Sequence, residues 1–175
     1  MVTLTPDKAQ VVDIALDGRR RVKAVRIVMA SDHAGYKLKK HLIEVVKSWG
    51  HEVCDVGCDS EESCDYPYFA EKAVFRILEK KADLGILVCG TGQGMAICAN
   101  KFPGIRAAVC QEPYSARAAR EHNDANILAL GARIVGPGVA EMIVEHFLTA
   151  RFAGGRHQQR IDLIGKIEDV YMKRR

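Results

Sequence analysis

Residues 84–94 have the sequence LGILVCGTGQG, and this stretch indicates the fold class. Residues 84–88 are apolar at every position, which is typical of a strand buried on both faces of a parallel sheet. A glycine-rich turn follows, and a helix is expected to begin at Met95. A strand, a tight turn and a helix in this order form the repeating unit of α/β proteins.

The same alternation of strand and helix extends outward along the chain. Further strands are expected at residues 25–30, 52–56, 106–110 and 127–130. Apolar residues at helical spacing predict helices over residues 38–49, 66–81, 113–121 and 139–150. We therefore predict a three-layer α/β/α sandwich around a five-stranded parallel, Rossmann-like sheet. Residues 1–24 are expected to form an N-terminal extension, and residues 25–175 one domain that ends in a tail from residue 154.

Composition and charge narrow the class of protein. The chain has 175 residues, enough to bury a core without disulfides. Lys and Arg number 26 and Asp and Glu 22, so the net charge of +4 does not by itself predict binding to nucleic acid. No apolar run approaches the roughly 20 residues that cross a bilayer, and residues 1–21 lack the apolar core of a secretory signal. We expect a cytoplasmic protein without nucleic-acid or membrane partners.

The chain contains six cysteines, which could be taken for disulfides or a metal site. They are Cys54, Cys58, Cys64, Cys89, Cys98 and Cys110. No C-x-x-C pair is present, and the spacing of the first three relative to His51 fits no standard zinc pattern. The prediction is six reduced thiols, mostly structural, and no metal.

Ligands of open parallel sheets bind beyond the carboxyl ends of the strands, so the residues there are candidates for a site. Asp32 and His33 follow the first strand, and Cys89 with its glycine turn follows the third. Gln111 and Glu112 follow the fourth strand, and Arg133 follows the fifth. Asp32 has an alternative role as a helix N-cap. His122 and Asn123 end a predicted helix, where a histidine also interacts favourably with the helix dipole.

The turn after the third strand contains Gly90, Gly92 and Gly94. Its backbone N–H groups could bind an anion, or the glycines could serve only to make a tight turn. It matches neither a dinucleotide fingerprint nor a Walker A loop. Cys89 could be a packing residue, or a thiolate favoured by the adjacent helix N-terminus. Thr91 could hydrogen-bond that thiol or a substrate hydroxyl.

Near the C-terminus, Gly154 and Gly155 precede Arg156 and Arg160. The two arginines lie one helical turn apart, hence on one face. Together they could bind a phosphate through charge-assisted hydrogen bonds, or they could form a solvated basic face.

Seven motifs in order resemble the ribose/galactose family of phosphosugar isomerases, and the type B ribose-5-phosphate isomerases in particular. They are SDHAG at 31–35, DYP at 65–67, CGTGQGM at 89–95, ANKFPGIRA at 99–107, EPYSA at 112–116, HNDAN at 122–126 and GGRHQQR at 154–160. The resemblance implies an aldose–ketose isomerase that interconverts ribose 5-phosphate and ribulose 5-phosphate through a cis-enediolate, in the non-oxidative pentose phosphate pathway. It also implies a homodimer or dimer of dimers with sites completed across the interface, and no metal or cofactor.

The resemblance further implies roles for individual residues. Cys89 would be the general base, Thr91 its hydrogen-bonding neighbour, and His122 the residue that opens the furanose ring. The turn Gly90, Thr91, Gly92, Gln93 and Gly94 would hold the enediolate oxygen. Sugar contacts would come from Asp32, Tyr66 and Asn123, and phosphate contacts from His33, Arg133, Arg156 and Arg160. Some relatives use a glutamate after the turn, but residues 95–97 here contain no carboxylate, which supports Cys89.

Two alternatives remain open at this point. One is an isomerase of a hexose 6-phosphate such as allose or galactose 6-phosphate. The other is a non-catalytic sugar-phosphate binding module. The presence of both Cys89 and His122 disfavours a binding module, since binding alone needs no proton transfer, and it favours a self-sufficient homo-oligomer.

Overall fold

The computed structural model describes residues 24–172, whose five strands form one parallel sheet. The strands are β1 (Arg26–Ser31), β2 (Glu52–Asp55), β3 (Leu84–Cys89), β4 (Ala107–Val109) and β5 (Ile127–Gly131). They lie in the order β2-β1-β3-β5-β4, and every neighbouring pair is parallel. The predicted sheet is confirmed, and no strand end differs from its predicted position by more than one residue.

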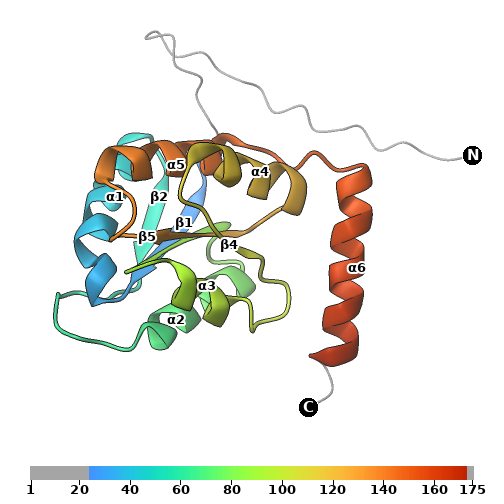
Figure 1. Ribbon diagram of the computed structural model, residues 1–175, viewed down its shortest axis with the longest axis horizontal. Helices are drawn as coiled ribbons and strands as arrows, with labels where there is room; N and C mark the ends of the chain where they lie inside the picture. The colour runs from blue at the N-terminus through green and yellow to red at the C-terminus, as the bar shows by residue number, and fades with distance from the viewer. Residues whose placement is uncertain (1–23, 173–175) are drawn as a thin grey trace, which may run out of the picture.

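Helices cover both faces of the sheet, as the predicted sandwich requires (Figure 1). α1 (Tyr36–Ser48), α4 (Pro113–Asn123) and α5 (Pro137–Thr149) pack on one face. α2 (Tyr66–Leu78) and α3 (Gln93–Ala99) pack on the other face. Because α1 follows β1 on one face and α3 follows β3 on the other, the chain diverges between these two strands. That divergence is where ligands bind in open α/β sheets.

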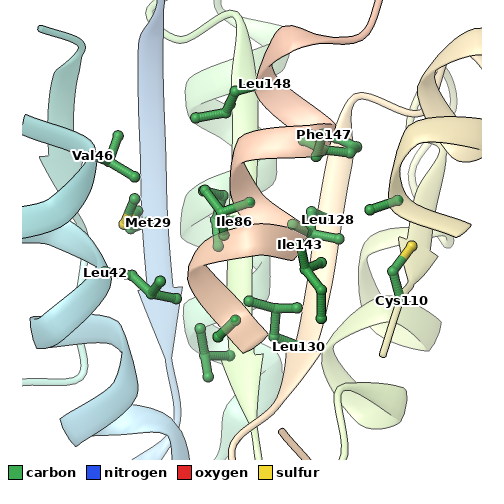
Figure 2. Packing of buried hydrophobic residues seen from close by; sticks show 14 of the residues in the cluster. Met29, Leu42, Val46, Ile86, Cys110, Leu128, Leu130, Ile143, Phe147 and Leu148 are labelled. Carbon is green, nitrogen blue, oxygen red and sulfur yellow. The ribbon is translucent and has the colours of Figure 1, made fainter. Parts of the chain in front are cut away.

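The larger hydrophobic core lies under α1, α4 and α5 (Figure 2). Ile143 and Phe147 of α5 pack against strand residues such as Ile86 and Leu128, and all four are fully buried. Burying a side chain of this size stabilises the folded state by about 1.5–3 kcal/mol. The core therefore fixes the strands whose ends carry the candidate site residues.

Local sequence explains how the helices begin and end. Glu112 is the N-cap of α4, where its carboxylate accepts hydrogen bonds from the N–H groups of Tyr114 and Ser115, both at 2.6 Å. Pro113 occupies the first turn of α4, where its missing N–H costs no hydrogen bond. Gly50 follows α1 with a φ of +88°, the left-handed conformation that ends many helices. Glu112 is thus a capping residue in this fold.

The expected C-terminal tail is a 16-residue helix, α6 (Arg156–Tyr171), which stands apart from the sandwich beside its edge (Figure 1). The N–H of Gly104 donates to the Glu168 carboxylate at 3.0 Å and ties α6 to the body. Several large apolar side chains of α6 remain exposed: Leu163, Ile164, Ile167, Val170 and Tyr171. Within residues 24–172, no helix combines the length and apolar character needed to span a membrane.

Candidate active site

Asp32 directly follows β1 and is almost fully buried, at 7% exposure. Its N–H donates to the carbonyl of Val88 in β3 at 3.1 Å, which holds the two strand ends together. Its Oδ1 accepts from the N–H of Gly35 at 2.9 Å and caps the short 3₁₀ turn His33–Gly35. The alternative role predicted for Asp32, as a helix N-cap, is therefore confirmed. This cap uses only one oxygen of the carboxylate.

Cys89 ends β3 with 4% of its surface exposed. The N–H of Gly92 donates to its sulfur at 3.1 Å, so a backbone dipole points at the atom where a thiolate charge would sit. Gly92 has a φ of +81°, a conformation that glycine adopts without strain. The Thr91 hydroxyl accepts from the N–H of Gln93 at 3.4 Å, so in this structure Thr91 stabilises the turn and the thiol is bonded to Gly92.

Two side chains from other elements lie against the glycine turn. A Cβ on Gly94 would lie 2.8 Å from the Tyr66 ring, so that ring packs directly on the backbone of the turn. A Cβ on Gly90 would lie 3.5 Å from the Arg133 guanidinium. Tyr66 from the start of α2 and Arg133 from beyond β5 therefore meet at the turn after β3.

His33 completes this group of residues. Its Nδ1 accepts a hydrogen bond from the N–H of Cys64 at 3.3 Å, across the loop that joins β2 to α2. We call the whole group the strand-end cluster. Its members are Asp32, His33, Tyr66, Cys89, Gly90, Thr91, Gly92, Gln93, Gly94 and Arg133.

His122 belongs to a second group, at the C-terminal end of α4. Its ring stacks on the ring of His157 in α6, with centroids 4.4 Å apart and planes inclined by 7°. Burial lowers the pKa of His157, and the charges of His122, Arg156 and Arg160 lower it further. We call these residues and the adjacent Asn123 the His122 cluster. His157 was not among the residues expected at the site, although it directly follows Arg156 in the GGRHQQR motif.

The two clusters lie toward opposite ends of the strands. Helix N-termini in this fold follow the carboxyl ends of strands, and α4 then runs back by about 16 Å over its 11 residues. His122 therefore lies toward the amino ends of the strands, whereas Cys89 lies at a carboxyl end. Among the hydrogen bonds, ion pairs and ring contacts of residues 24–172, none joins the two clusters. One chain thus brings together only part of the predicted site.

The six cysteines are unpaired, including Cys54, Cys58 and Cys64. His51 Nδ1 accepts from the N–H of Val25 at 3.2 Å, so this histidine is bonded to the backbone. In the described part of the chain, no three His, Cys, Asp or Glu side chains gather in a way that could hold a metal ion.

This chain is similar to known proteins in sequence and in fold. The family model described as Ribose/Galactose Isomerase matches residues 27–164. The chain belongs to the ribose/galactose isomerase family. Ribose-5-phosphate isomerase B of Escherichia coli (strain K12) is 48% identical over 143 residues, which cover 82% of this chain and 96% of that protein.

Solved structures of this family have the same fold. Ribose-5-phosphate isomerase B of Clostridium thermocellum superposes with a TM-score of 0.83 at 51% identity, covering 83% of this chain and 99% of the other. The Mycoplasma genitalium ribose-5-phosphate isomerase B with bound ribulose-5-phosphate gives a TM-score of 0.79 at 42% identity, covering 82% and 96%. The resemblance inferred from the motifs is confirmed, and so is the fold.

Proposed function

We propose that this chain interconverts ribose 5-phosphate and ribulose 5-phosphate through a cis-enediolate. Family membership and relatives named ribose-5-phosphate isomerase B support this substrate. The observation that carries the chemistry is the buried Cys89 thiol at the end of β3, with the Gly92 N–H on its sulfur. We place the reaction in the cytoplasm and in the non-oxidative pentose phosphate pathway.

In the proposed mechanism, the Cys89 thiolate removes the proton from C2 of the open-chain aldose and returns it to C1. The electron pair of the broken C2–H bond forms the C1=C2 double bond, and the carbonyl pair moves onto O1, which becomes the enediolate oxygen. The proton of the C2 hydroxyl passes to O1, and the carbonyl forms at C2 as C1 takes the proton back from Cys89. The Gly92 N–H donates to the Cys89 sulfur, so the backbone N–H groups of Gly90 and Gly94 in the same turn are the donors proposed to stabilise the enediolate oxygen. A donor in such a position contributes about 3 kcal/mol to lowering a barrier. These proton transfers require no metal and no cofactor.

Other members of the strand-end cluster would hold the substrate. We assign sugar contacts to Asp32 and Tyr66, and phosphate contacts to His33 and Arg133. The Asp32 carboxylate suits hydroxyl groups because it only accepts hydrogen bonds when ionised. The Arg133 guanidinium, which packs on Gly90, suits a phosphate because it offers several donors in one plane.

The remaining roles require a second copy of the chain. His122, which would open the furanose ring, lies toward the amino ends of the strands, whereas Cys89 lies at a carboxyl end. Asn123 and the two arginines of α6 belong to the same cluster as His122. We therefore propose a homodimer, or a dimer of dimers, in which the His122 cluster of one copy completes the strand-end cluster of its partner. The exposed apolar side chains of α6 fit this proposal, with Ile167 exposed by 59% and Tyr171 by 76%.

The decisive experiment compares wild type with Cys89→Ala in an isomerisation assay in D₂O. The variant should lose about 10²–10⁴-fold in turnover, the usual contribution of a general base. Deuterium should enter C2 of recovered ribose 5-phosphate only with wild type. Cys54→Ala is the matched control, since Cys54 is an exposed thiol outside both clusters. Near wild-type exchange by Cys89→Ala would show that another residue is the base.

The same assay tests His122 and the substrate. His122→Asn should impair ribose 5-phosphate more than ribulose 5-phosphate, because the ketose phosphate cannot close a furanose ring through its esterified C5 oxygen. Including allose 6-phosphate and galactose 6-phosphate measures the preference for a pentose directly. Faster turnover of a hexose phosphate would reassign the substrate within the same family.

A further inference from the structure

Lys39 of α1 is a fully buried lysine outside the catalytic residues proposed above. Its Nζ donates to Oδ1 of Asp55 at 2.5 Å and to the carbonyl of Cys58 at 2.8 Å. The ammonium also lies 5.8 Å from the centre of the Tyr36 ring. A buried ammonium is costly unless it is paired and hydrogen-bonded, so these partners account for its place in the fold.

The two partners of Lys39 lie where β2 passes into the segment that joins it to α2, residues 56–65; Asp55 is the last residue of β2, and Cys58 belongs to the segment. Asp55 ends β2, and its Oδ1 also accepts from the N–H of Gly57 at 3.0 Å. Lys39 therefore fixes the first residues of this loop against α1. The loop could not leave this position without stranding a buried positive charge.

The loop is bonded in turn to residues of the strand-end cluster. Gly57 accepts from the N–H of Ser31 at 2.7 Å, and the N–H of Cys58 donates back to Ser31 at 2.9 Å. Ser31 directly precedes Asp32 and His33. At the far end of the loop, the N–H of Cys64 donates to His33 Nδ1 at 3.3 Å. The loop thus contacts the last residue of β1 near its first end and His33, beyond β1, near its second end.

The bond from Cys64 has a chemical consequence for His33. A backbone N–H can only donate, so His33 Nδ1 must accept and cannot carry a proton. A neutral imidazole in this position therefore has its hydrogen on Nε2. That Nε2–H is a donor suited to an anionic oxygen of the substrate.

We propose that Lys39 is a positioning residue that, through Asp55 and the 56–65 loop, holds His33 as an Nε2–H donor for the substrate phosphate. The phosphate contact of His33 rests on the function proposed above, whereas the effect of Lys39 on the loop and the tautomer does not. The competing explanation is that Lys39 only stabilises the core.

Lys39→Met should raise KM for ribose 5-phosphate about tenfold, or 1.4 kcal/mol, as expected for a misplaced hydrogen bond to a charged group. The turnover number should change by less than about twofold, because the base and the turn are untouched. Lys40→Met is the matched control, an exposed lysine one residue along α1, and it should leave both constants unchanged. In a His33→Ala background, Lys39→Met should no longer raise KM.

Lys39→Met leaves the Asp55 carboxylate without its cation and could unfold the chain. The double variant Lys39→Met/Asp55→Asn removes both charges and should recover much of the melting temperature. If Lys39 positions the loop, KM stays raised in the double variant, because the Cys58 carbonyl still lacks its donor. If KM returns to wild type together with the melting temperature, Lys39 serves only the fold and the proposal is wrong.

A measurement without substrate separates this proposal from the proposed function. The ¹⁵N shifts of the His33 ring, assigned by comparison with His33→Ala, should report the Nε2–H tautomer in wild type and a mixture in the double variant. An unchanged tautomer in the double variant would overturn the positioning role. If the wild-type protein isomerises no phosphosugar, the proposed function is wrong. The tautomer measurement would still decide whether Lys39 positions His33.

Discussion

Gly35 is the point at which the turn after β1 packs against the end of β3, so Gly35→Ala probes how the strand-end cluster is assembled. A Cβ at this position would lie 2.2 Å from the Val88 carbonyl oxygen and 2.5 Å from its carbon. Ordinary contacts of a Cβ begin near 3.4 Å, so the two backbone segments would have to separate by more than about 1 Å. No flexible side chain is available to absorb this movement, because the obstacle is backbone.

The movement would displace Asp32 and Cys89 from each other. The Val88 carbonyl accepts from the N–H of Asp32, and Cys89 is the next residue of β3. Overpacking of this kind destabilises a protein by about 1–3 kcal/mol. For a chain of this size, each kcal/mol lowers the melting temperature by about 2–4 °C. A displacement near 1 Å in a catalytic site can reduce turnover by about 10²-fold.

The assay is thermal unfolding together with isomerase turnover, and Gly138→Ala is the matched control. Gly138 lies in α5, and nothing lies within 4 Å of a Cβ built there. The control should keep wild-type turnover and gain up to about 1 kcal/mol, because alanine favours a helix over glycine. If Gly35→Ala melts and turns over like wild type, the close approach at Val88 does not hold the cluster together.

Two further predictions concern phosphate binding and pH. Arg156→Ala should raise KM for ribose 5-phosphate about tenfold or more. The melting temperature should change little, since Arg156 is exposed. An equal loss of kcat/KM with unphosphorylated ribose would contradict a phosphate role. Burial lowers the pKa of His51 below its usual 6.5. Near this pH the folded protein therefore binds fewer protons than the unfolded chain. The free energy of unfolding should fall as the pH drops through about 6.5. His51→Asn should flatten this dependence in urea unfolding between pH 7 and pH 5, and an unchanged slope would assign it to other groups.

The sequence by itself determined the fold class and the place of the glycine turn after β3. Residues 84–88 are apolar at every position because β3 is buried on both faces, so the pattern could be recognised without knowing its neighbours. The position of Cys89 after this strand followed directly, and the rule that ligands bind at carboxyl ends selected Asp32 and Arg133. These features depend on residues close together in the chain, where local periodicity carries the signal.

Only the tertiary structure decided which distant residues meet. Periodicity says nothing about the strand order β2-β1-β3-β5-β4, which depends on how the connections cross the sheet. A lysine such as Lys39 is normally expected at the surface, and its burial depends on a carboxylate 16 residues away. The stack of His122 on His157 joins residues 35 positions apart, and the direction of α4 separates His122 from Cys89. Such contacts arise from packing between elements, which no short stretch of sequence encodes.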